Sequence, residues 1–432
     1  MGEMWCGYKR TISIKQVTPI IHFQWNEEGA CIRGSEFKPK FDRFILEHKK
    51  EYENKLNAII DDSCYCDKEN GALNYKIRIS PSSNDKDVSD TIGRDIAKLK
   101  VDNNESVEWE KKKQEKKKID KEHIGINGLY FGNMGKTEEE IIEKYKEAIK
   151  YRDDIKVTFV CTNEKLQKII DGAFEDFIAI TNFGTRQNKG FGSFVTESLT
   201  LEKEKEILNK LKIAFFYCKT KPDTDKLMLV DAIYSCMKGG KNNNKFYIES
   251  FIQKHYLDNK KSDKAFIKSQ GLFEGDEEGN EEGNEENYAY VRALLGLADH
   301  IDFKDPQGKE KYDGDTTIRI GRVNVMSADS IDEKIERYKS PFTVKILEDS
   351  IFFIYEDTFE LIKGKKFKFK GESEKSRRKT VIYGKESAPI FVPDTFDVNS
   401  FICKFVKYYN NEKEKYKNSK DYNEAAIIEL EQ

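Results

Sequence analysis

Residues 181–194 read TNFGTRQNKGFGSF, which places three glycines and a serine around two cations within one short stretch. Glycine lacks a Cβ, so its backbone adopts positive φ angles easily and its N–H group is open to a ligand. Converging N–H groups, with the charges of Arg186 and Lys189 and the hydroxyl of Ser193, are donors that hold a phosphate. Such contacts position a nucleic-acid strand without reading its bases. The alternative is that the glycines only allow a tight turn of the protein itself.

Two other phosphate-binding loops do not fit the order of residues in this stretch. A dinucleotide fold places its glycines directly after the first strand, at the start of a helix, with an acidic residue about 20 positions later. Here Gly184, Gly190 and Gly192 follow a predicted helix and lead into a predicted strand. A Walker A loop requires a lysine directly after its last glycine, whereas Ser193 follows Gly192 in this sequence. A nucleic-acid phosphate site and a structural turn are left as the two interpretations.

The elements around the loop are predicted from hydrophobic periodicity. Residues 162–180 repeat apolar side chains at helical spacing, with Asn163 or Thr162 as the N-cap. An earlier helix is predicted over residues 35–60, with Ser35 as its N-cap. Strands are predicted where β-branched and aromatic residues are frequent, at residues 11–25, 74–80 and 155–161.

The second half of the chain begins near residue 211 and is predicted to add a helix at residues 288–303 and a C-terminal helix from about residue 396. Its strands are predicted at residues 211–220, 316–326, 340–347, 350–356 and 366–371. The repeated order of strand, helix and strand predicts an α+β fold with two tandem ferredoxin-like (RRM-like) domains. The first domain, residues 1–205, contains the glycine-rich loop, and the second comprises residues 206–432.

The composition favours a soluble protein with more than one core. The chain has 432 residues, of which 38% are hydrophobic and 35% are charged. We expect neither a membrane span nor a secretory signal, because the sequence has no long apolar run and its N-terminus is polar. Of eight cysteines only Cys64 and Cys66 lie close together, without a second pair at ligand spacing. We therefore predict reduced thiols, no metal site and a cytoplasmic location.

The charge is unevenly distributed along the chain. Residues 274–287, EGDEEGNEEGNEEN, contain eight acids and no cation, and leaving them out raises the net charge from −3 to +5. A mildly basic body permits nucleic acid as a partner. The acidic stretch itself is a low-complexity insertion in the second domain, with too few apolar residues to form a core.

Four motifs carry a resemblance to a known family. They are Val17-Thr18-Pro19-Ile20-Ile21, the segment RGSEFKPKFDR at residues 33–43, the segment NFGTRQNKGFGSF at residues 182–194, and RYKSPF at residues 337–342. With them the sequence resembles the RAMP superfamily of CRISPR-associated RNA-binding proteins, and most of all the first subunit of the Cmr complex of type III-B effectors. The chain departs from the family pattern at Thr185 to Gln187, where glycines are usual, and at Pro39 and Asn188.

The resemblance implies a non-catalytic RNA-binding subunit, without a cofactor, in a type III CRISPR ribonucleoprotein. Its RNA would be the guide RNA, alone or paired with target RNA, and its protein partners would be neighbouring RAMP subunits. Residues of the first helix and of the glycine loop would form a groove for RNA phosphates. These residues are Arg33, Ser35, Lys38, Lys40, Arg43, Gly184, Arg186, Lys189, Gly190, Gly192 and Ser193.

The alternative function is a metal-independent endoribonuclease that processes CRISPR repeat RNA. Related nucleases carry a general base near the position of His22, which could remove the proton of a ribose 2′-hydroxyl. Their glycine loop lies near the C-terminus, however, whereas more than half of this chain follows it. Asp42 is a candidate for metal-dependent cleavage, a role that carboxylates have in backbone RAMP subunits, but its position on a helix favours a surface ion pair with Lys38 or Arg43. A third interpretation is an assembly protein that makes no RNA contact.

Overall fold

The computed structural model of the chain describes the following residues: 5–21, 32–81, 89–91, 148–151, 154–221, 224, 226–243, 246–255, 261–272, 287–305, 318–330, 335, 338–372, 382–417 and 428–429. His22, Arg337 and residues 274–286 of the predicted acidic insertion lie outside the described residues.

The chain divides into two compact units. Unit 1 comprises Met1–Val230 and Thr343–Ile354, and unit 2 comprises Asp231–Phe342 and Tyr355–Gln432. The units follow contacts in space and are not continuous in sequence, unlike the predicted domains 1–205 and 206–432. The domain boundaries therefore stay predictions.

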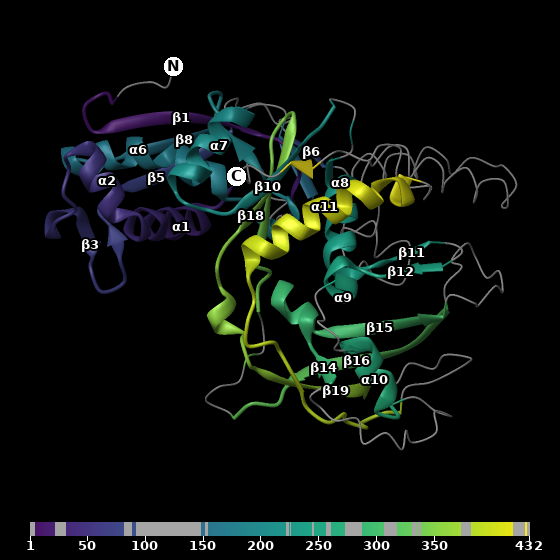
Figure 1. Cartoon of the computed structure of the whole chain (residues 1–432). Helices are drawn as coiled ribbons and strands as arrows, with labels where there is room; N and C mark the ends of the chain where they lie inside the picture. Colours follow the sequence, from purple (N-terminus) through teal and green to yellow (C-terminus); the bar gives the residue numbers. More distant parts are fainter. Residues whose placement is uncertain are drawn as a thin grey trace, which may run out of the picture. The chain divides into compact units, whose positions relative to one another are not determined.

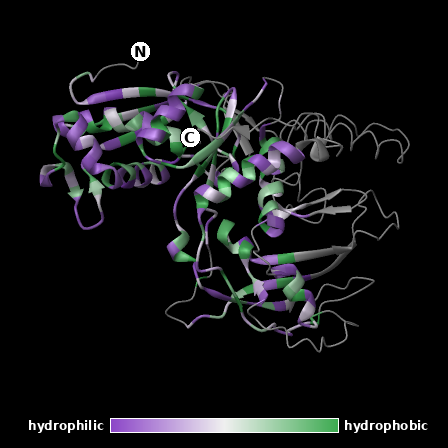
Figure 2. Cartoon of the chain, in the orientation of Figure 1, coloured by the Kyte–Doolittle hydropathy of each residue, from purple (hydrophilic) through white to green (hydrophobic). Residues whose placement is uncertain are grey.

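Unit 1 is built on a four-stranded antiparallel sheet in the order β5-β8-β1-β9 (Figure 1). Its strands are β1 (Lys9–Gln16), β5 (Lys76–Pro81), β8 (Ile155–Val160) and β9 (Phe194–Val195). Helix α1 (Gly34–Glu47) lies in the chain between β1 and β5, and α6 (Glu164–Ile180) lies between β8 and β9. Alternation along the strands is visible in Figure 2, where hydrophilic and hydrophobic colours follow each other along β1.

An aromatic core joins the two helices to one face of this sheet. Phe37 of α1 and Phe174 of α6 both contact Phe159 of β8, with ring centroids 6.5 Å and 5.7 Å away. Phe183, just after α6, stacks on Phe37 at 5.3 Å. Burying each such ring stabilises the fold by about 1.5–3 kcal/mol relative to an exposed ring. Both helices therefore cover the same face of the sheet.

The two helices begin differently. Asn163 caps α6 as predicted, because its side-chain oxygen accepts from the N–H groups of Lys165 and Leu166 at 3.0 Å and 3.2 Å. The prediction that Ser35 caps the first helix is wrong. Arg33 is the N-cap of α1, its side chain does not cap the N–H groups of the first turn, and Ser35 lies inside that turn.

The single helix predicted to residue 60 is divided in two. His48, with φ −101° and ψ 18°, leaves the helical conformation after α1. Helix α2 (Lys49–Leu56) follows and ends at Asn57, which has a left-handed φ of 48°. The remaining elements of unit 1 are β2 (Ile20–Ile21), η1 (Asp62–Cys64), β3 (Tyr65–Asp67), β4 (Ala72–Leu73), β6 (Ser89–Thr91), β7 (Ala148–Tyr151), η3 (Gln187–Lys189), α7 (Leu201–Lys210), β10 (Phe215–Lys219), β17 (Phe342–Ile346) and β18 (Ser350–Tyr355).

A hairpin from late in the chain completes unit 1. Strands β17 and β18 form it, and β18 pairs with β10 from Phe215↔Ile354 to Lys219↔Ser350. The Nζ of Lys345 on β17 is buried and donates to the carbonyl oxygens of Ile178, Thr181 and Phe194. The hairpin therefore anchors the end of α6 and the strand β9, between which the glycine loop lies.

Unit 2 contains a second antiparallel sheet, in the order β15-β16-β19-β20. The helix predicted over residues 288–303 is wrong, because Gly296 has a φ of +102° and the chain beyond it forms β15. Helix α8 (Lys226–Tyr234) spans the division between the units. The elements of unit 2 are η4 (Ser235–Gly239), β11 (Lys241–Asn243), β12 (Phe246–Ile248), α9 (Phe251–His255), β13 (Lys261–Ser262), α10 (Asp263–Ser269), β14 (Tyr288–Ala289), η6 (Val291–Leu295), β15 (His300–Asp305), β16 (Ile318–Ser327), η8 (Phe359–Leu361), β19 (Lys366–Glu372), β20 (Ile390–Phe391), α11 (Val398–Lys417) and β21 (Ile428–Glu429).

The structure is therefore a mixed one, with helices and several antiparallel sheets, which agrees with the predicted α+β class at that level. The late strands predicted from residue 316 onward are found as β16, β17, β18 and β19. Among the helices that the structure describes, none is long and apolar enough to cross a membrane.

Candidate nucleic-acid interface

The first helix and the glycine loop are brought together, as predicted, by a network around Lys40. The Nζ of Lys40 donates to Glu36 Oε1 at 2.8 Å, to Gln187 Oε1 at 2.8 Å and to the carbonyl oxygen of Asn182 at 3.1 Å. Glu36 in turn accepts the N–H of Gly184 at 3.0 Å. Lys40 is therefore neutralised and held by the protein, so its first role here is to fix the loop against α1.

The glycine loop uses its N–H groups inside the protein. Gly190 donates to the carbonyl of Gln187 at 3.1 Å, Gly192 donates to that of Pro19 at 2.9 Å, and Ser193 donates to the hydroxyl of Thr18 at 3.0 Å. With Gly184 bound to Glu36, these four amides already have acceptors. The nest of open N–H groups inferred from the sequence is therefore not formed by them, and any phosphate contact here depends on side chains.

Backbone geometry explains why the loop has glycines. Gly184, Gly190 and Gly192 have φ angles of +81°, +83° and +66°, a region that residues with a Cβ rarely adopt. A Cβ on Gly192 would lie 1.8 Å from the carbonyl oxygen of Phe183, and one on Gly184 would lie 2.7 Å from that of Ile21. The turn interpretation therefore accounts for all three glycines.

The other motifs of the resemblance pack directly on this loop. The hydroxyl of Thr18 donates to the carbonyl of Gly190 at 2.6 Å while it accepts from Ser193. On the other side the Asn182 amide donates to the carbonyl of Val344 at 2.7 Å, and the Ser193 hydroxyl donates to that of Ile346 at 2.8 Å. The Thr-Pro strand and the strand after the late Ser-Pro are thus structural partners of the loop.

The predicted cations differ in how far they reach the surface. Arg43 is exposed, Arg33, Arg186 and Lys189 are half-buried, and the predicted Ser35 is exposed. Arg186 has a left-handed φ of 58°, and partial burial lowers the pKa of its guanidinium from the usual value. We define the α1–loop surface as Arg33, Ser35, Arg43, Arg186 and Lys189. Its positive charge comes from the three arginines and the lysine.

Lys38 is directed inward. Its Nζ donates to Asp42 Oδ2 at 2.6 Å and to the carbonyl of Leu73 at 2.9 Å, and it lies 4.1 Å from the ring centre of Tyr75. Asp42 is only 5% exposed. The expected ion pair of Asp42 with Lys38 is confirmed, but its carboxylate is buried and its lysine half-buried, where a surface pair is predicted from the sequence.

Among the described residues, no cluster of three or more His, Cys, Asp or Glu side chains is placed to hold a metal ion. Cys64 is buried and Cys66 is exposed, and both are free thiols. Burial raises the pKa of the Cys64 thiol.

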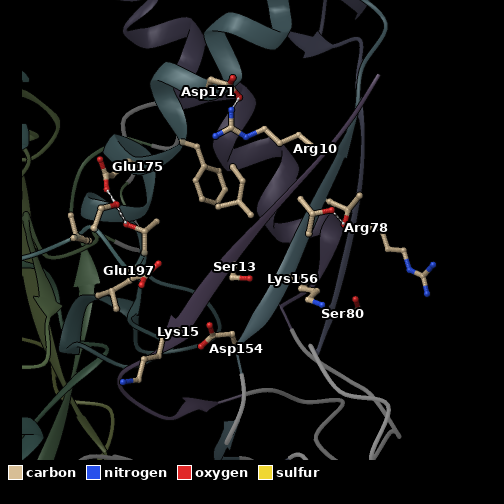
Figure 3. Close-up of a pocket in the computed structure, with 18 of the residues that line it drawn as sticks. Arg10, Ser13, Lys15, Arg78, Ser80, Asp154, Lys156, Asp171, Glu175 and Glu197 are labelled. Atoms are coloured by element: carbon tan, nitrogen blue, oxygen red, sulfur yellow. Dashed lines mark hydrogen bonds and ion pairs between the residues drawn. The ribbon is translucent and has the colours of Figure 1, made fainter. Parts of the chain in front are cut away.

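Unit 1 also has a groove that the sequence reasoning missed. Its volume is about 1520 Å³, and it runs over the sheet face turned away from α1 and α6 and around the edge of β1 (Figure 3). Ser13 and Lys15 of β1, Arg78 and Ser80 of β5, and Lys156 of β8 line it. The signal in the sequence is the period-two alternation of polar and apolar residues in these strands. Which face lies open, however, depends on where the helices pack.

Comparison with known proteins gives two family matches. The model of the Cmr1 N-terminal domain matches residues 7–241, and that of the Cmr1 C-terminal domain matches residues 247–429. Among solved structures, a chain of the cryo-EM structure of the type III-B Cmr-beta bound to cognate target RNA matches with 13% identity and a TM-score of 0.36. That match covers 80% of this chain and 94% of the other. The search of curated proteins found no match.

Proposed function

Because the chain belongs to the Cmr1 family, with its N- and C-terminal domains in sequence, we propose that it is an RNA-binding subunit of a type III-B CRISPR effector complex. The resemblance inferred from the sequence motifs is thereby confirmed at the level of the family. The RNA is the guide RNA, alone or paired with its target, and neighbouring RAMP subunits are the protein partners in the cytoplasm.

The main observation in support of this proposal is that the family motifs found in the sequence lie next to one another in unit 1. Thr18, the start of α1, the glycine loop and β17 are far apart in the sequence and joined by hydrogen bonds in unit 1. The α1–loop surface, with Arg33, Arg43, Arg186 and Lys189, lies on this assembly. Arginines and lysines held on a rigid support are suited to contact RNA phosphates. The strand order β5-β8-β1-β9, with α1 and α6 in the crossovers, supports a ferredoxin-like assignment for this domain.

A four-residue variant tests the proposal. Arg33, Arg43, Arg186 and Lys189 are changed to Ala in the full chain, and its affinity for single-stranded RNA is measured together with its melting temperature. We expect RNA affinity, measured well below the melting temperature, to fall while the protein stays folded. The melting temperature itself should decrease somewhat, because only Arg43 is exposed and Arg33, Arg186 and Lys189 are half-buried. As a control that removes three charges elsewhere on unit 1, Lys50, Lys55 and Lys168, which are exposed on α2 and α6, are changed to Ala together. Equal RNA affinity of both variants and the wild type would contradict the proposal.

We also propose that the chain has no catalytic role of its own. Asp42 is buried and is engaged by Lys38, which supports a structural role for this carboxylate. Incubation of the wild-type chain with CRISPR repeat RNA, with and without EDTA, separates the two functions. We expect intact RNA in both samples, and a cyclic-phosphate product in the presence of EDTA would establish the endoribonuclease instead.

A further inference from the structure

The open face of the unit 1 sheet presents one kind of charge. Ile155, Val157 and Phe159 of β8 are buried toward the helices, so the residues between them point to the other side. The same alternation holds in β1 and β5. The residues on the open face are Lys9, Thr11, Ser13 and Lys15 of β1, Lys156, Thr158 and Val160 of β8, and Lys76, Arg78 and Ser80 of β5. These include five cations and no acid.

Four of these cations are not neutralised by neighbours. Lys9, Lys76, Arg78 and Lys156 are exposed, and none of them forms an ion pair among the interactions that the described residues make. The fifth, Lys15, is paired with Glu348, which raises the pKa of the lysine. The free positive charge is therefore concentrated on β8, β5 and the start of β1.

Strand register sets these side chains in rows across the face. Lys76 and Lys9 flank Val160, while Arg78 and Thr11 flank Thr158. In the third row Ser80 and Ser13 flank Lys156. Neighbouring strands lie about 4.8 Å apart and successive residues of one face about 7 Å apart along a strand. Cations and hydroxyl donors at such spacing match the successive phosphates of an extended nucleic-acid strand.

The residue types on the open face are not suited to recognise RNA bases. RRM-type sheets bind RNA bases by stacking them on aromatic side chains. Among the outward residues of β1, β5 and β8 there is no aromatic ring. Ring stacking supplies much of the affinity of single-strand binders for bases. A strand on this face would be held by its phosphates and therefore without regard to sequence.

Acidic residues limit the surface on one side. Glu175, Glu197, Glu348 and Asp349 line the part of the groove around the edge of β1. Asp154, directly before β8, lies near Lys15 and marks the end of the cationic rows. Figure 3 shows Glu175 and Glu197 on the opposite side of the groove from Arg78, Ser80 and Lys156. A polyanion is repelled by the glutamates and attracted by Arg78 and Lys156. The ligand path therefore follows β8 and β5.

We propose that the open face of the β5-β8-β1 sheet is a second RNA-binding surface, which holds the phosphate backbone of a single strand independently of its sequence. The inference rests on the proposed RNA-binding function, but it concerns the sheet face opposite α1. Unit 1 then has two separate sets of RNA contacts, on the α1–loop surface and on the sheet face.

The test compares variants of the full chain on fluorescein-labelled oligouridylate and oligoadenylate over a range of salt concentrations. The face variant changes Lys76, Arg78 and Lys156 to Ala, and the Lys50, Lys55 and Lys168 variant is its charge-matched control. Removing three phosphate contacts makes the slope of log K against log salt shallower by roughly 2 and weakens binding about tenfold or more at low salt. We expect this loss for both RNAs in the face variant, with an unchanged melting temperature, and no loss in the control.

Other results would overturn the inference in distinguishable ways. In one outcome the face variant binds RNA with wild-type affinity and salt slope, while the α1–loop variant binds weakly. This result would leave the proposed function intact and would show that the sheet face does not bind RNA. An acidic protein segment would then be the remaining polyanionic partner of the face. Loss of oligoadenylate binding alone would contradict the sequence-independent contact. Failure of the wild-type chain to bind either RNA would overturn both the proposed function and this inference.

Discussion

At the scale of single residues, the glycine loop is shaped by its own protein. Its three glycines have positive φ angles, and the amides of Gly184, Gly190, Gly192 and Ser193 all donate to protein acceptors. A phosphate nest and a structural turn predict the same glycines from sequence, and they differ only in where the N–H groups point. In this structure the glycines serve the turn, and the proposed RNA contact of the loop therefore depends on the side chains of Arg186 and Lys189.

The first prediction concerns Gly192. Gly192→Ala places a Cβ 1.8 Å from the carbonyl oxygen of Phe183, so we expect a loss of about 3 kcal/mol or more in the free energy of unfolding. Gly7→Ala is the matched control, since Gly7 also has a positive φ, of +61°, but its Cβ would meet no atom within 4 Å. The control should lose only about 1–2 kcal/mol. Equal stabilities of the two variants in urea unfolding would show that the loop is not tightly packed.

The second prediction concerns the buried Glu204. Burial raises the pKa of its carboxyl from 4.5 to about 8, and among the described residues neither side-chain oxygen has a hydrogen-bond partner. Between these values the folded state keeps a proton that the unfolded state loses, so the free energy of unfolding falls as pH rises. The slope is at most about 1.4 kcal/mol per pH unit.

Glu204→Gln removes this titration and keeps the shape of the side chain. From about pH 5 to about pH 6, below the range in which Lys345 releases its proton, the variant should lose less stability than the wild type. Urea unfolding at several pH values measures this. Parallel pH profiles of the two proteins would mean that Glu204 is ionised in the folded state.

At the scale of elements, unit 1 depends on a hairpin that follows more than a hundred residues after the loop it supports. Lys345 on β17 is fully buried, burial lowers its pKa to about 7, and its Nζ donates to three carbonyl oxygens at the end of α6 and in β9. Ser193 and Asn182 of the loop bond to the same strand. The late Ser-Pro motif therefore marks the start of the strand β17, which holds the glycine loop in place.

The third prediction is that Lys345→Met destabilises the protein by about 3 kcal/mol, because three buried carbonyl oxygens lose their donor. Lys15→Met is the control, since Lys15 forms an exposed pair with Glu348 and such pairs contribute about 0–1 kcal/mol. Thermal melting of both variants gives the comparison. A Lys345→Met protein as stable as the control would show that the hairpin is not held by this contact.

Local signals in the sequence were sufficient for part of this structure. The period of α6, its cap at Asn163 and the strands β16 to β19 were predicted, because each depends on neighbouring residues. The predicted N-cap Ser35 lies two residues after the observed N-cap Arg33, since several residues near it could start the helix. The role of Lys345 and the exposure of Lys156 depend on sheet order and on packing between distant segments. Single-sequence patterns do not contain that information.

At the scale of the whole molecule, the chain joins two Cmr1 domains and a mildly basic body to a strongly acidic stretch. Unit 1 carries the two cationic surfaces, on α1 with the loop and on the open sheet face. Neither surface offers a set of aromatic rings for base stacking. We therefore propose that this protein binds RNA through its phosphates.

The most direct test of that claim is the affinity of the wild-type full chain for oligouridylate and oligoadenylate, measured by fluorescence anisotropy over a series of salt concentrations. Each phosphate contact on a single strand contributes about −0.7 to the slope of log K against log salt. The account predicts a straight line with a clearly negative slope and nearly equal affinities for the two RNAs. A flat salt response, or strong preference for one RNA, would contradict it.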